Sequence, residues 1–296
     1  MCRFVLYLGT PLTLDMLTTR PLHSIINQSI HARERKEPLN GDGFGIAWYV
    51  PELSSNPAVF RSVKPAWNNR NLIHLARVTR SSCILAHVRA ASPGLPVNEA
   101  NCHPFQVGRL AFMHNGHIPD FRKIKRAIHR RLSDAVFDDI MGSTDSEHVF
   151  ALFRERYVPV PGRANTEAMA RALSGTISDV VEIMDEQGVS GPAQLNLAVS
   201  DGETAVVSCF CSDEAVAPNS LYVHEGMRYV TENGRCRMVK PDQGHEAVLI
   251  ASEPLSRDPG WDPVPHNHLI LVYPDGQVVL RAHCTTGTPD REAQNI

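Results

Sequence analysis

The sequence lacks long hydrophobic runs, cysteine pairs in the CxxC spacing and a strong excess of charge of either sign. No stretch of its 296 residues approaches the roughly 20 apolar residues that a membrane-spanning helix requires. The net charge of −3 is too small to indicate a nucleic-acid or membrane partner. With 43% hydrophobic and 21% charged residues, the chain has an ordinary globular composition, and we expect no nucleic-acid and no membrane partner.

The seven cysteines are odd in number, and their spacings match neither a disulfide framework nor a zinc knuckle. A short apolar run over residues 4–8 is too brief for the core of a signal peptide, and it soon meets Pro11. These features are typical of a chain with reduced thiols. We therefore expect a cytoplasmic protein.

Apolar runs bounded by turn residues predict strands over residues 3–9, 46–50, 83–88 and 110–114. Towards the C-terminus, pairs of apolar runs flank glycine-containing turns. They predict three hairpins, at Asp201-Gly202, Glu225-Gly226 and Asp275-Gly276.

Helical spacing of apolar residues predicts four helical segments. These are residues 14–30 with a break at Pro21, residues 121–132, a helix that begins at 143–147, and residues 167–187. The order of strands, helices and further strands predicts an α+β fold with antiparallel sheets in one domain. Residues 285–296 are polar and predict a loose C-terminal tail.

Two of these helices carry further signals. Residues 121–132 hold six Lys or Arg residues outside the apolar face, which a solvated helix face explains and a nucleic-acid surface would explain as the alternative. At the start of the other helix, Thr144 and Glu147 have the spacing of a capping box.

The start of the chain offers a nucleophile. Removal of Met1 would leave Cys2 with a free α-amine, whose ordinary pKa of about 7.7–8.0 suits a general base near neutral pH. Nucleophile and base would then belong to one residue. By itself, the Met-Cys start also occurs by chance.

Asn115 and Gly116 follow the predicted strand at residues 110–114. Acyl transfer needs hydrogen-bond donors aimed at the oxyanion, and the Asn115 side chain with the Gly116 N–H could supply them. The alternative is a hairpin turn, for which Asn-Gly is a strong signal.

Arg89 and Asp145 could bind the two charged ends of an amino acid. Arg89 follows a predicted buried strand and can hold a carboxylate with two parallel hydrogen bonds. Asp145 stands in the first turn of a predicted helix and could accept an ammonium group. The alternatives are a solvated arginine at a strand end and an aspartate stabilised by the helix dipole.

Several short segments stand in a fixed order along the chain. They are Met1-Cys2-Arg3, Asp42-Gly43-Phe44-Gly45, Ala86-His87-Val88-Arg89, Asn101-Cys102-His103-Pro104-Phe105, Phe112-Met113-His114-Asn115-Gly116, Ser143-Thr144-Asp145-Ser146-Glu147 and Ala251-Ser252-Glu253-Pro254-Leu255. In this order and approximate spacing the chain resembles the class II glutamine amidotransferases over about residues 2–283.

The resemblance implies a four-layer αββα sandwich of two antiparallel sheets, the fold of the N-terminal-nucleophile hydrolases. It implies Cys2 as the nucleophile with its own α-amine as base, and an oxyanion hole at Asn115 and Gly116. It also implies that Arg89 and Asp145 bind the glutamyl carboxylate and ammonium, and that Asp42 and Gly43 belong to the pocket wall. His87 and His103 fall in family motifs, and we expect them to be structural supports.

The chain looks most like the stand-alone subgroup of this family. That subgroup includes an ergothioneine-pathway γ-glutamyl amidohydrolase and a fungal amidotransferase of glutathione degradation. We therefore predict one glutamine amidotransferase domain over residues 2–284, which hydrolyses the γ-glutamyl amide of glutamine or of another small γ-glutamyl compound. Cys102 departs from the small hydroxyl residue that the resemblance leads us to expect, and residues 162–192 match no segment of the family.

Two alternatives keep the fold and change the function. One is a glutaminase subunit that delivers ammonia to a synthetase or other protein subunit. The other is a non-catalytic binding module, which the complete set of competent residues disfavours.

A metal hydrolase is a third alternative, because the chain has 14 histidines. The close pairs are His114 with His117 and His266 with His268, and His103 could join them. No carboxylate completes a recognisable ligand set, so we expect no catalytic metal and no cofactor.

Overall fold

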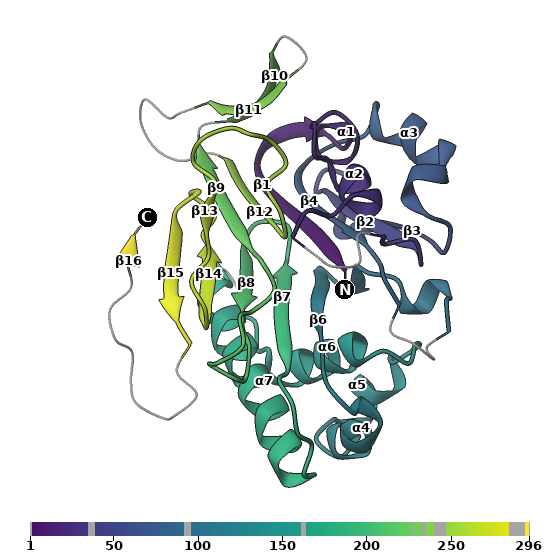
Figure 1. Cartoon of the computed structure of the whole chain (residues 1–296), viewed down its shortest axis with the longest axis vertical. Coiled ribbons are helices and arrows are strands. Elements are labelled where there is room, and N and C mark those ends of the chain that lie inside the picture. Colours follow the sequence, from purple (N-terminus) through teal and green to yellow (C-terminus); the bar gives the residue numbers. More distant parts are fainter. Residues whose placement is uncertain are drawn as a thin grey trace.

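The structure is a computed structural model that describes residues 2–34, 39–91, 96–160, 164–226, 228–232, 235–239, 247–283 and 294–295. Two antiparallel sheets lie face to face, and helices cover both outer faces (Figure 1). The first sheet has the order β13-β9-β12-β1-β4-β2-β3. Its strands are β1 (Arg3–Thr13), β2 (Phe44–Val50), β3 (Ser54–Ser62), β4 (Arg80–Val88), β9 (Tyr222–Gly226), β12 (Ala247–Ala251) and β13 (Asp262–Pro263).

The second sheet has the order β16-β15-β14-β8-β7-β6-β5. Its strands are β5 (Phe105–Val107), β6 (Leu110–His117), β7 (Gln194–Ser200), β8 (Ala205–Cys209), β14 (His268–Val272), β15 (Val278–Ala282) and β16 (Gln294–Asn295). A separate ribbon is formed by β10 (Arg228–Glu232) and β11 (Arg235–Val239).

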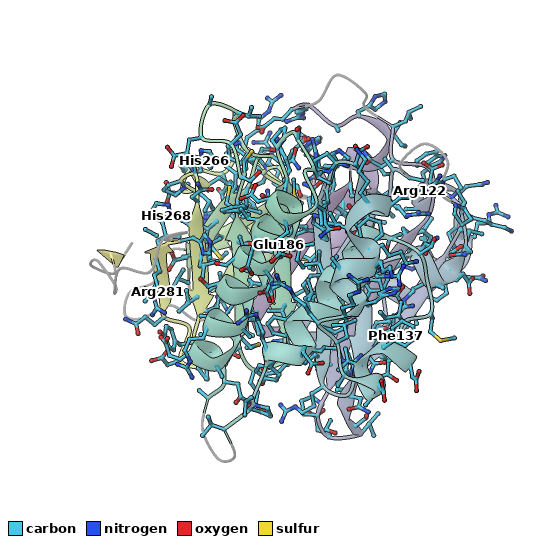
Figure 2. The ribbon with its side chains drawn as sticks, turned by 90° about the horizontal axis from the view of Figure 1, so that it is seen from below. Arg122, Phe137, Glu186, His266, His268 and Arg281 are labelled. Carbon is cyan, nitrogen blue, oxygen red and sulfur yellow. The ribbon has the colours of Figure 1, made fainter. Side chains whose placement is uncertain are left out.

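Short helices cover the outer face of the first sheet and longer ones cover the second. The first group is α1 (Asp15–Thr18), α2 (Ile25–Ile30) and α3 (Arg70–Ala76). The second group is α4 (Phe121–His129), α6 (Asp145–Arg156) and α7 (Thr166–Glu186), and the short α5 (Asp134–Asp138) packs against α6. Figure 2 shows this second helical side, with Arg122 of α4, Phe137 of α5 and Glu186 of α7 labelled on it. Two 3-10 turns, Ala66–Asn68 and Glu99–Asn101, complete the helical elements of the described residues.

Alternate residues of each central strand face different layers. In β1, Phe4 and Leu6 pack between the two sheets, whereas Val5 packs beneath the first group of helices. In β6, Met113 faces the other sheet and Phe112 faces the second group of helices. This period of two produces a helix–sheet–sheet–helix sandwich. The predicted α+β fold with two antiparallel sheets is confirmed.

Most predicted elements occur where the sequence places them. The four early strands are β1, β2, β4 and β6, and the first predicted helix divides into α1 and α2 around Pro21. Two of the predicted hairpins, β7–β8 and β14–β15, form as expected. The tail at residues 285–296 lies outside the described residues except for β16, which pairs with β15. In the part of the chain that the structure describes, no helix has the length and apolarity to cross a membrane.

The predicted hairpin at Glu225-Gly226 is wrong. The strand before this turn, β9, pairs with β12 and β13, whereas the strand after it, β10, pairs with β11. The reason lies in β12, in which every residue is buried. A strand buried on both faces needs hydrogen-bonded neighbours along both edges, and β9 supplies the second edge.

At the N-terminus of α6, one of the two hydrogen bonds of the predicted capping box is present. The Thr144 hydroxyl accepts a hydrogen bond from the Glu147 N–H at 3.2 Å. The Glu147 carboxylate accepts instead from the main-chain N–H groups of Met141 and Gly142, at 2.9 and 2.6 Å. Glu147 therefore fixes the loop before α6 as well as its first turn.

Two of the basic residues around α4, Lys123 and Arg131, take part in surface ion pairs. Lys123 pairs with Asp120, and Arg131 pairs with Asp179 and Glu182 of α7. The apolar face of α4 is buried at Ile124. These contacts fit the solvated face that the sequence predicts.

Candidate active site

Cys2 directly precedes β1, the central strand of the first sheet (Figure 1). Arg3 pairs with Val88 at the end of β4, so Cys2 lies opposite the segment that follows β4. The Cys2 Sγ is 3.7 Å from the main-chain carbonyl oxygen of Ala90, and the residue is 8% exposed. Strand pairing thus places the thiol beside residues 89–91.

Arg89 and Asp42 hold each other through the main chain. The Arg89 N–H donates to the Gly43 carbonyl at 2.8 Å, and the Asp42 N–H donates to the Arg89 carbonyl at 3.0 Å. The Arg89 Nη1 is 3.4 Å from the Asp42 carbonyl, and the Asp42 carboxylate accepts the Ala91 N–H at 2.8 Å.

The Arg89 guanidinium is buried, since the residue is only 3% exposed. Within the described residues it forms no ion pair with a carboxylate. A buried cation without an anion is unfavourable, so this guanidinium is suited to bind a substrate carboxylate. The solvated-arginine alternative is wrong.

Gly43 is a glycine for a physical reason. Its φ of +113° is a conformation that favours glycine, and an added Cβ would lie 2.7 Å from the Cys102 Sγ. Cys102 is fully buried, and its thiol is 3.4 Å from the Asn98 carbonyl. Burial raises the pKa of the Cys102 thiol, so it stays protonated near neutral pH.

Asn115 lies inside β6 rather than in a turn. It pairs with Asn196 of β7, and Gly116 pairs with Leu195, so the hairpin-turn alternative is wrong. The Asn115 side chain is fully buried, and its Nδ2 donates to the Ser252 hydroxyl at 3.3 Å. An amide nitrogen carries two hydrogens, so a second donor remains for a ligand.

Gly116 allows β7 to approach. An added Cβ would lie 1.8 Å from the Gln194 carbonyl oxygen and 2.3 Å from the His114 Nε2. Any side chain at this position would therefore displace the neighbouring strand. The close strand contact is sufficient reason for glycine here, independently of an oxyanion.

Asp145 is the first residue of α6. Its carboxylate accepts the Ile118 N–H at 3.0 Å and the Ser146 N–H at 2.8 Å, and within the described residues it forms no ion pair. It also lines a cavity of about 300 Å³ with His117 and Ile118. The helix-dipole explanation and the ammonium role are both compatible with this geometry.

A chain of hydrogen bonds joins Asp145 to the first sheet. Ser146 Oγ lies 3.2 Å from the Asp145 Oδ1 and 2.9 Å from the His114 Nδ1. The His114 carbonyl in turn lies 3.1 Å from the His87 Nε2 in β4. Cys2, Arg89, Asp42 and Gly43 thus lie together, and this chain of contacts connects them to Asp145 across the two sheets.

The two family-motif histidines are neutral near physiological pH. Burial lowers the pKa of His87 to about 3 and holds that of His103 well below its usual value. Neutral His87 can donate Nε2–H to the His114 carbonyl, and the His103 ring stacks on it. These contacts agree with a supporting role.

Two histidines of the metal alternative, His114 and His268, form hydrogen bonds within the fold. His114 contacts Ser146 and the Gln194 carbonyl, and His268 Nδ1 contacts the His266 carbonyl. Among the described residues, no group of three or more His, Cys, Asp or Glu side chains is arranged to hold a metal ion.

Sequence reasoning gave no role to Ser252, Glu253, Arg3 or His23. Glu253 forms a buried ion pair with Arg3 and contacts His23 at 2.7 Å. The sequence signal was that Arg3, Ser252 and Glu253 belong to the quoted motifs, and none pointed to His23. Nothing in the sequence pairs Arg3 with a carboxylate 250 residues away.

The profile of class-II glutamine amidotransferases matches residues 14–295 of this chain. The chain belongs to that family. It is 40% identical to the probable glutamine amidotransferase DUG3 of Saccharomyces cerevisiae over 292 residues, which cover 92% of this chain and 82% of the yeast protein. It is 28% identical to the gamma-glutamyl-hercynylcysteine sulfoxide hydrolase of Mycolicibacterium smegmatis, with 95% of this chain and 99% of that protein covered.

Solved structures show the same fold at lower identity. A glutamine aminotransferase class-II domain protein from Silicibacter pomeroyi superposes with a TM-score of 0.66 at 24% identity, covering 96% of this chain and 100% of that one. Glutamine phosphoribosylpyrophosphate amidotransferase from Bacillus subtilis gives 0.59 at 12% identity, covering 96% of this chain and 50% of that one. The predicted family and its N-terminal-nucleophile fold are confirmed, and the roles of the seven site residues stay predictions.

Proposed function

We propose that this family member hydrolyses the γ-glutamyl amide of a small molecule, with Cys2 as the nucleophile. The observation that carries the proposal is the Cys2 thiol beside the Arg89 segment, whose buried guanidinium forms no ion pair within the described residues. A nucleophile next to a carboxylate-binding cation suits a substrate that carries both an amide and a free carboxylate.

The first step is acylation. After loss of Met1, which lies outside the described residues, the Cys2 α-amine takes the thiol proton, and the thiolate attacks the γ-carbonyl carbon. Asn115 Nδ2 and the Gly116 N–H stabilise the oxyanion. The C–N bond then breaks, the amine leaves with the proton from the α-ammonium, and a γ-glutamyl thioester remains on Cys2.

The second step is hydrolysis. The α-amine accepts a proton from water, which attacks the thioester carbonyl, and the Cys2 thiol leaves with that proton. Glutamate is released and the enzyme returns to its starting state. In both steps Arg89 holds the α-carboxylate and Asp145 the α-ammonium, while Asp42 and Gly43 form the pocket wall.

These residues all contact the glutamyl half of the substrate. The leaving amine is therefore not selected by them, and glutamine, γ-glutamyl peptides and γ-glutamyl thiol metabolites are all candidates. The name of the mycobacterial relative specifies a γ-glutamyl compound rather than free glutamine. We propose a γ-glutamyl compound of that kind as the preferred substrate class.

We also propose that the protein works in a reducing compartment such as the cytoplasm. Among the described residues, Cys83, Cys102, Cys209, Cys211 and Cys236 form no disulfide, and all five are buried. This supports the expectation from cysteine spacing.

The test combines intact mass with turnover. Purified protein is weighed by mass spectrometry and assayed for glutamate release from glutamine and from a panel of γ-glutamyl peptides. We expect loss of Met1, glutamate release, and a Cys2→Ala variant with no turnover but an unchanged melting temperature. Cys209→Ala is the matched control, because Cys209 is also a buried cysteine and lies in the second sheet.

Three outcomes separate the alternatives. Glutamate release that persists in Cys2→Ala would remove Cys2 from the mechanism. Processed protein that is inert on every γ-glutamyl compound would favour the non-catalytic binding module. Activity on glutamine that appears only with a co-purifying synthetase would favour the ammonia-delivering subunit.

A further inference from the structure

One hydroxyl oxygen lies between the nucleophile strand and the predicted oxyanion donor. β12 pairs with β1 as far as Ala251 and Val5, and the next residue, Ser252, still donates its N–H to the Phe4 carbonyl at 3.0 Å. The Phe4 N–H, however, donates to the Ser252 Oγ at 3.0 Å. The Ser252 carbonyl instead accepts from the Ser220 hydroxyl at 2.8 Å. The Ser252 hydroxyl oxygen thus accepts the Phe4 N–H in place of the Ser252 carbonyl, at the point where β12 ends.

The same Ser252 Oγ accepts a hydrogen bond from the Asn115 Nδ2 at 3.3 Å. Phe4 belongs to the first sheet and Asn115 to the second, and both residues are fully buried, as is Ser252. One oxygen therefore joins the strand that begins just after Cys2 to the side chain in the facing sheet. This contact also fixes the orientation of the Asn115 amide group, because its Nδ2 is the atom that donates to the Ser252 oxygen.

The neighbouring residue, Glu253, fixes the nucleophile from the other side. Its Oε1 is 2.8 Å from the Arg3 Nε, and the Arg3 Nη1 donates to the Cys2 carbonyl at 2.9 Å. The second carboxylate oxygen lies 2.7 Å from the His23 Nε2 and accepts the Arg33 N–H at 2.9 Å. Both Arg3 and Glu253 are 1% exposed, so this arrangement is closed to solvent.

We propose that Ser252 and Glu253 are positioning residues that set the Cys2 nucleophile in register with the Asn115 oxyanion donor. The inference rests on the proposed function, since it assigns a task to residues that would act through Cys2 and Asn115. Neither residue touches the substrate in this mechanism. Ser252 aims the Asn115 amide, and Glu253 holds the Arg3 side chain that restrains the Cys2 main chain.

Both restraints have a physical purpose. An oxyanion donor is effective because its orientation is fixed before the reaction. Without the Ser252 oxygen, the Asn115 amide can rotate and present its carbonyl oxygen, which repels an oxyanion. A chain terminus frays unless it is tied down, and after loss of Met1 the nucleophile is the terminus. The Arg3 contact ties it through the Cys2 carbonyl.

The first test replaces the hydroxyl. For Ser252→Ala we expect kcat to fall by about tenfold to a hundredfold with KM within about twofold, because a positioning loss acts on the transition state. Ser252→Thr keeps the oxygen and should recover kcat to within about threefold. Ser208→Ala is the matched control, since its fully buried hydroxyl also makes two hydrogen bonds, to the Leu195 carbonyl and from the Leu197 N–H in the second sheet. The control should lose stability and keep kcat.

The second test concerns Arg3. Arg3→Lys keeps the charge but cannot contact both Glu253 and the Cys2 carbonyl in the geometry of a planar guanidinium. We expect slower alkylation of Cys2 by iodoacetamide and an altered pH profile of that reaction. Arg281→Lys is the control, because Arg281 of β15 also contacts a carboxylate, that of Glu167, but lies in the second sheet (Figure 2).

Two results would overturn the proposal. One is Ser252→Ala with kcat within twofold of the parent, and the other is equal losses in Ser252→Ala and Ser252→Thr. A parent protein that turns over no γ-glutamyl compound would instead defeat the proposed function. In that case the side-chain amide NMR signals of Asn115 decide the positioning role, which fails if they are unchanged in Ser252→Ala and holds if they show rotational averaging.

Discussion

The imidazole rings of His87 and His103 stack with their centroids 4.1 Å apart and 27° between their planes. Both residues are almost fully buried, at 1% and 3% exposure. Burial lowers the pKa of His87 to about 3 and places that of His103 well below its usual value. Two adjacent imidazoles thus remain neutral in the folded protein over a pH range in which they would be charged in the unfolded chain.

This pair predicts a loss of stability in mild acid. A histidine with a lowered folded pKa binds its proton first in the unfolded state, so its contribution is complete above about pH 6.5 and declines as the pH falls towards 3. One such histidine contributes a slope of about 1.4 kcal/mol per pH unit in that window. Urea denaturation of the parent and of His87→Gln at pH 7, 6 and 5 measures it, and the variant should have the smaller slope.

The pH slope of the parent must be compared with that of His87→Gln, because another group changes the stability in the opposite direction over the same pH range. Burial raises the pKa of Glu225 to about 7, so its folded form takes up a proton as the pH falls through that value. The overall slope of the parent therefore combines both effects. Equal slopes in the parent and in His87→Gln would contradict the assignment to His87.

The buried ion pair predicts a large effect of Glu253→Gln. Removing one charge leaves the Arg3 guanidinium buried without an anion, which costs roughly 3–5 kcal/mol. Glu167→Gln is the matched control, because Glu167 also pairs with an arginine but is 44% exposed and should lose only about 1 kcal/mol or less. Chemical denaturation at pH 7 measures both. Similar losses in the two variants would show that burial of the Glu253 pair is energetically unimportant.

Glu253 also predicts an effect at lower pH. Although burial alone would raise the pKa of its carboxyl, hydrogen bonds from His23 and the Arg33 N–H and the charge of Arg3 lower it to about 2. The stabilisation is therefore complete above the unfolded pKa of about 4.3 and is lost as the pH falls towards 2. Acid unfolding of Glu253→Gln should be less steep than that of the parent between pH 4 and 2. An identical steepness would contradict the lowered pKa.

The sequence predicted those features that depend on neighbours along the chain. Alternation in residues 3–9 was sufficient for β1, and the position of Arg89 after a buried strand was sufficient to suggest a functional cation. The contacts that join the site are not local. Ser252 lies 137 residues from Asn115 and 248 from Phe4, and no pattern in a single sequence encodes such pairs.

Two local signals were misleading because tertiary contacts outweighed them. No hairpin forms at Glu225-Gly226, because the strand before it pairs with β12, which is buried and needs a neighbouring strand on both edges. The Asn115-Gly116 pair, a strong turn signal, continues β6 because β7 lies alongside it and its close approach leaves space only for glycine. In both cases the pairing of strands overrode the preference of two residues.

Asn115→Ala should reduce kcat by about 10²–10³, as expected for the loss of one oxyanion donor. KM should change little, because the donor contacts charge that develops only in the transition state. Steady-state kinetics with a γ-glutamyl peptide measures both constants. Asn27→Ala is the control, since Asn27 lies on the exposed side of α2, where its side chain donates to the Leu22 carbonyl. Undiminished turnover in Asn115→Ala would remove Asn115 from the oxyanion hole.

Arg89→Lys should impair substrate binding. A planar guanidinium can form two parallel hydrogen bonds with a carboxylate, and an ammonium group cannot reproduce that geometry. Loss of one charge-assisted hydrogen bond corresponds to a rise of about tenfold or more in KM. The charge is kept, so the buried site still holds a cation, and the melting temperature should fall by only a few degrees.

The control for Arg89→Lys is Arg109→Lys. Arg109 is 47% exposed and pairs with exposed Glu203 at the surface, so its exchange should leave both KM and kcat unchanged. A substrate analogue that lacks the α-carboxylate should bind the parent and Arg89→Lys with equal affinity, because it cannot use the lost hydrogen bond. If Arg89→Lys instead kept the KM of the parent for the full substrate, the carboxylate would be bound elsewhere, and the buried guanidinium would need a different explanation.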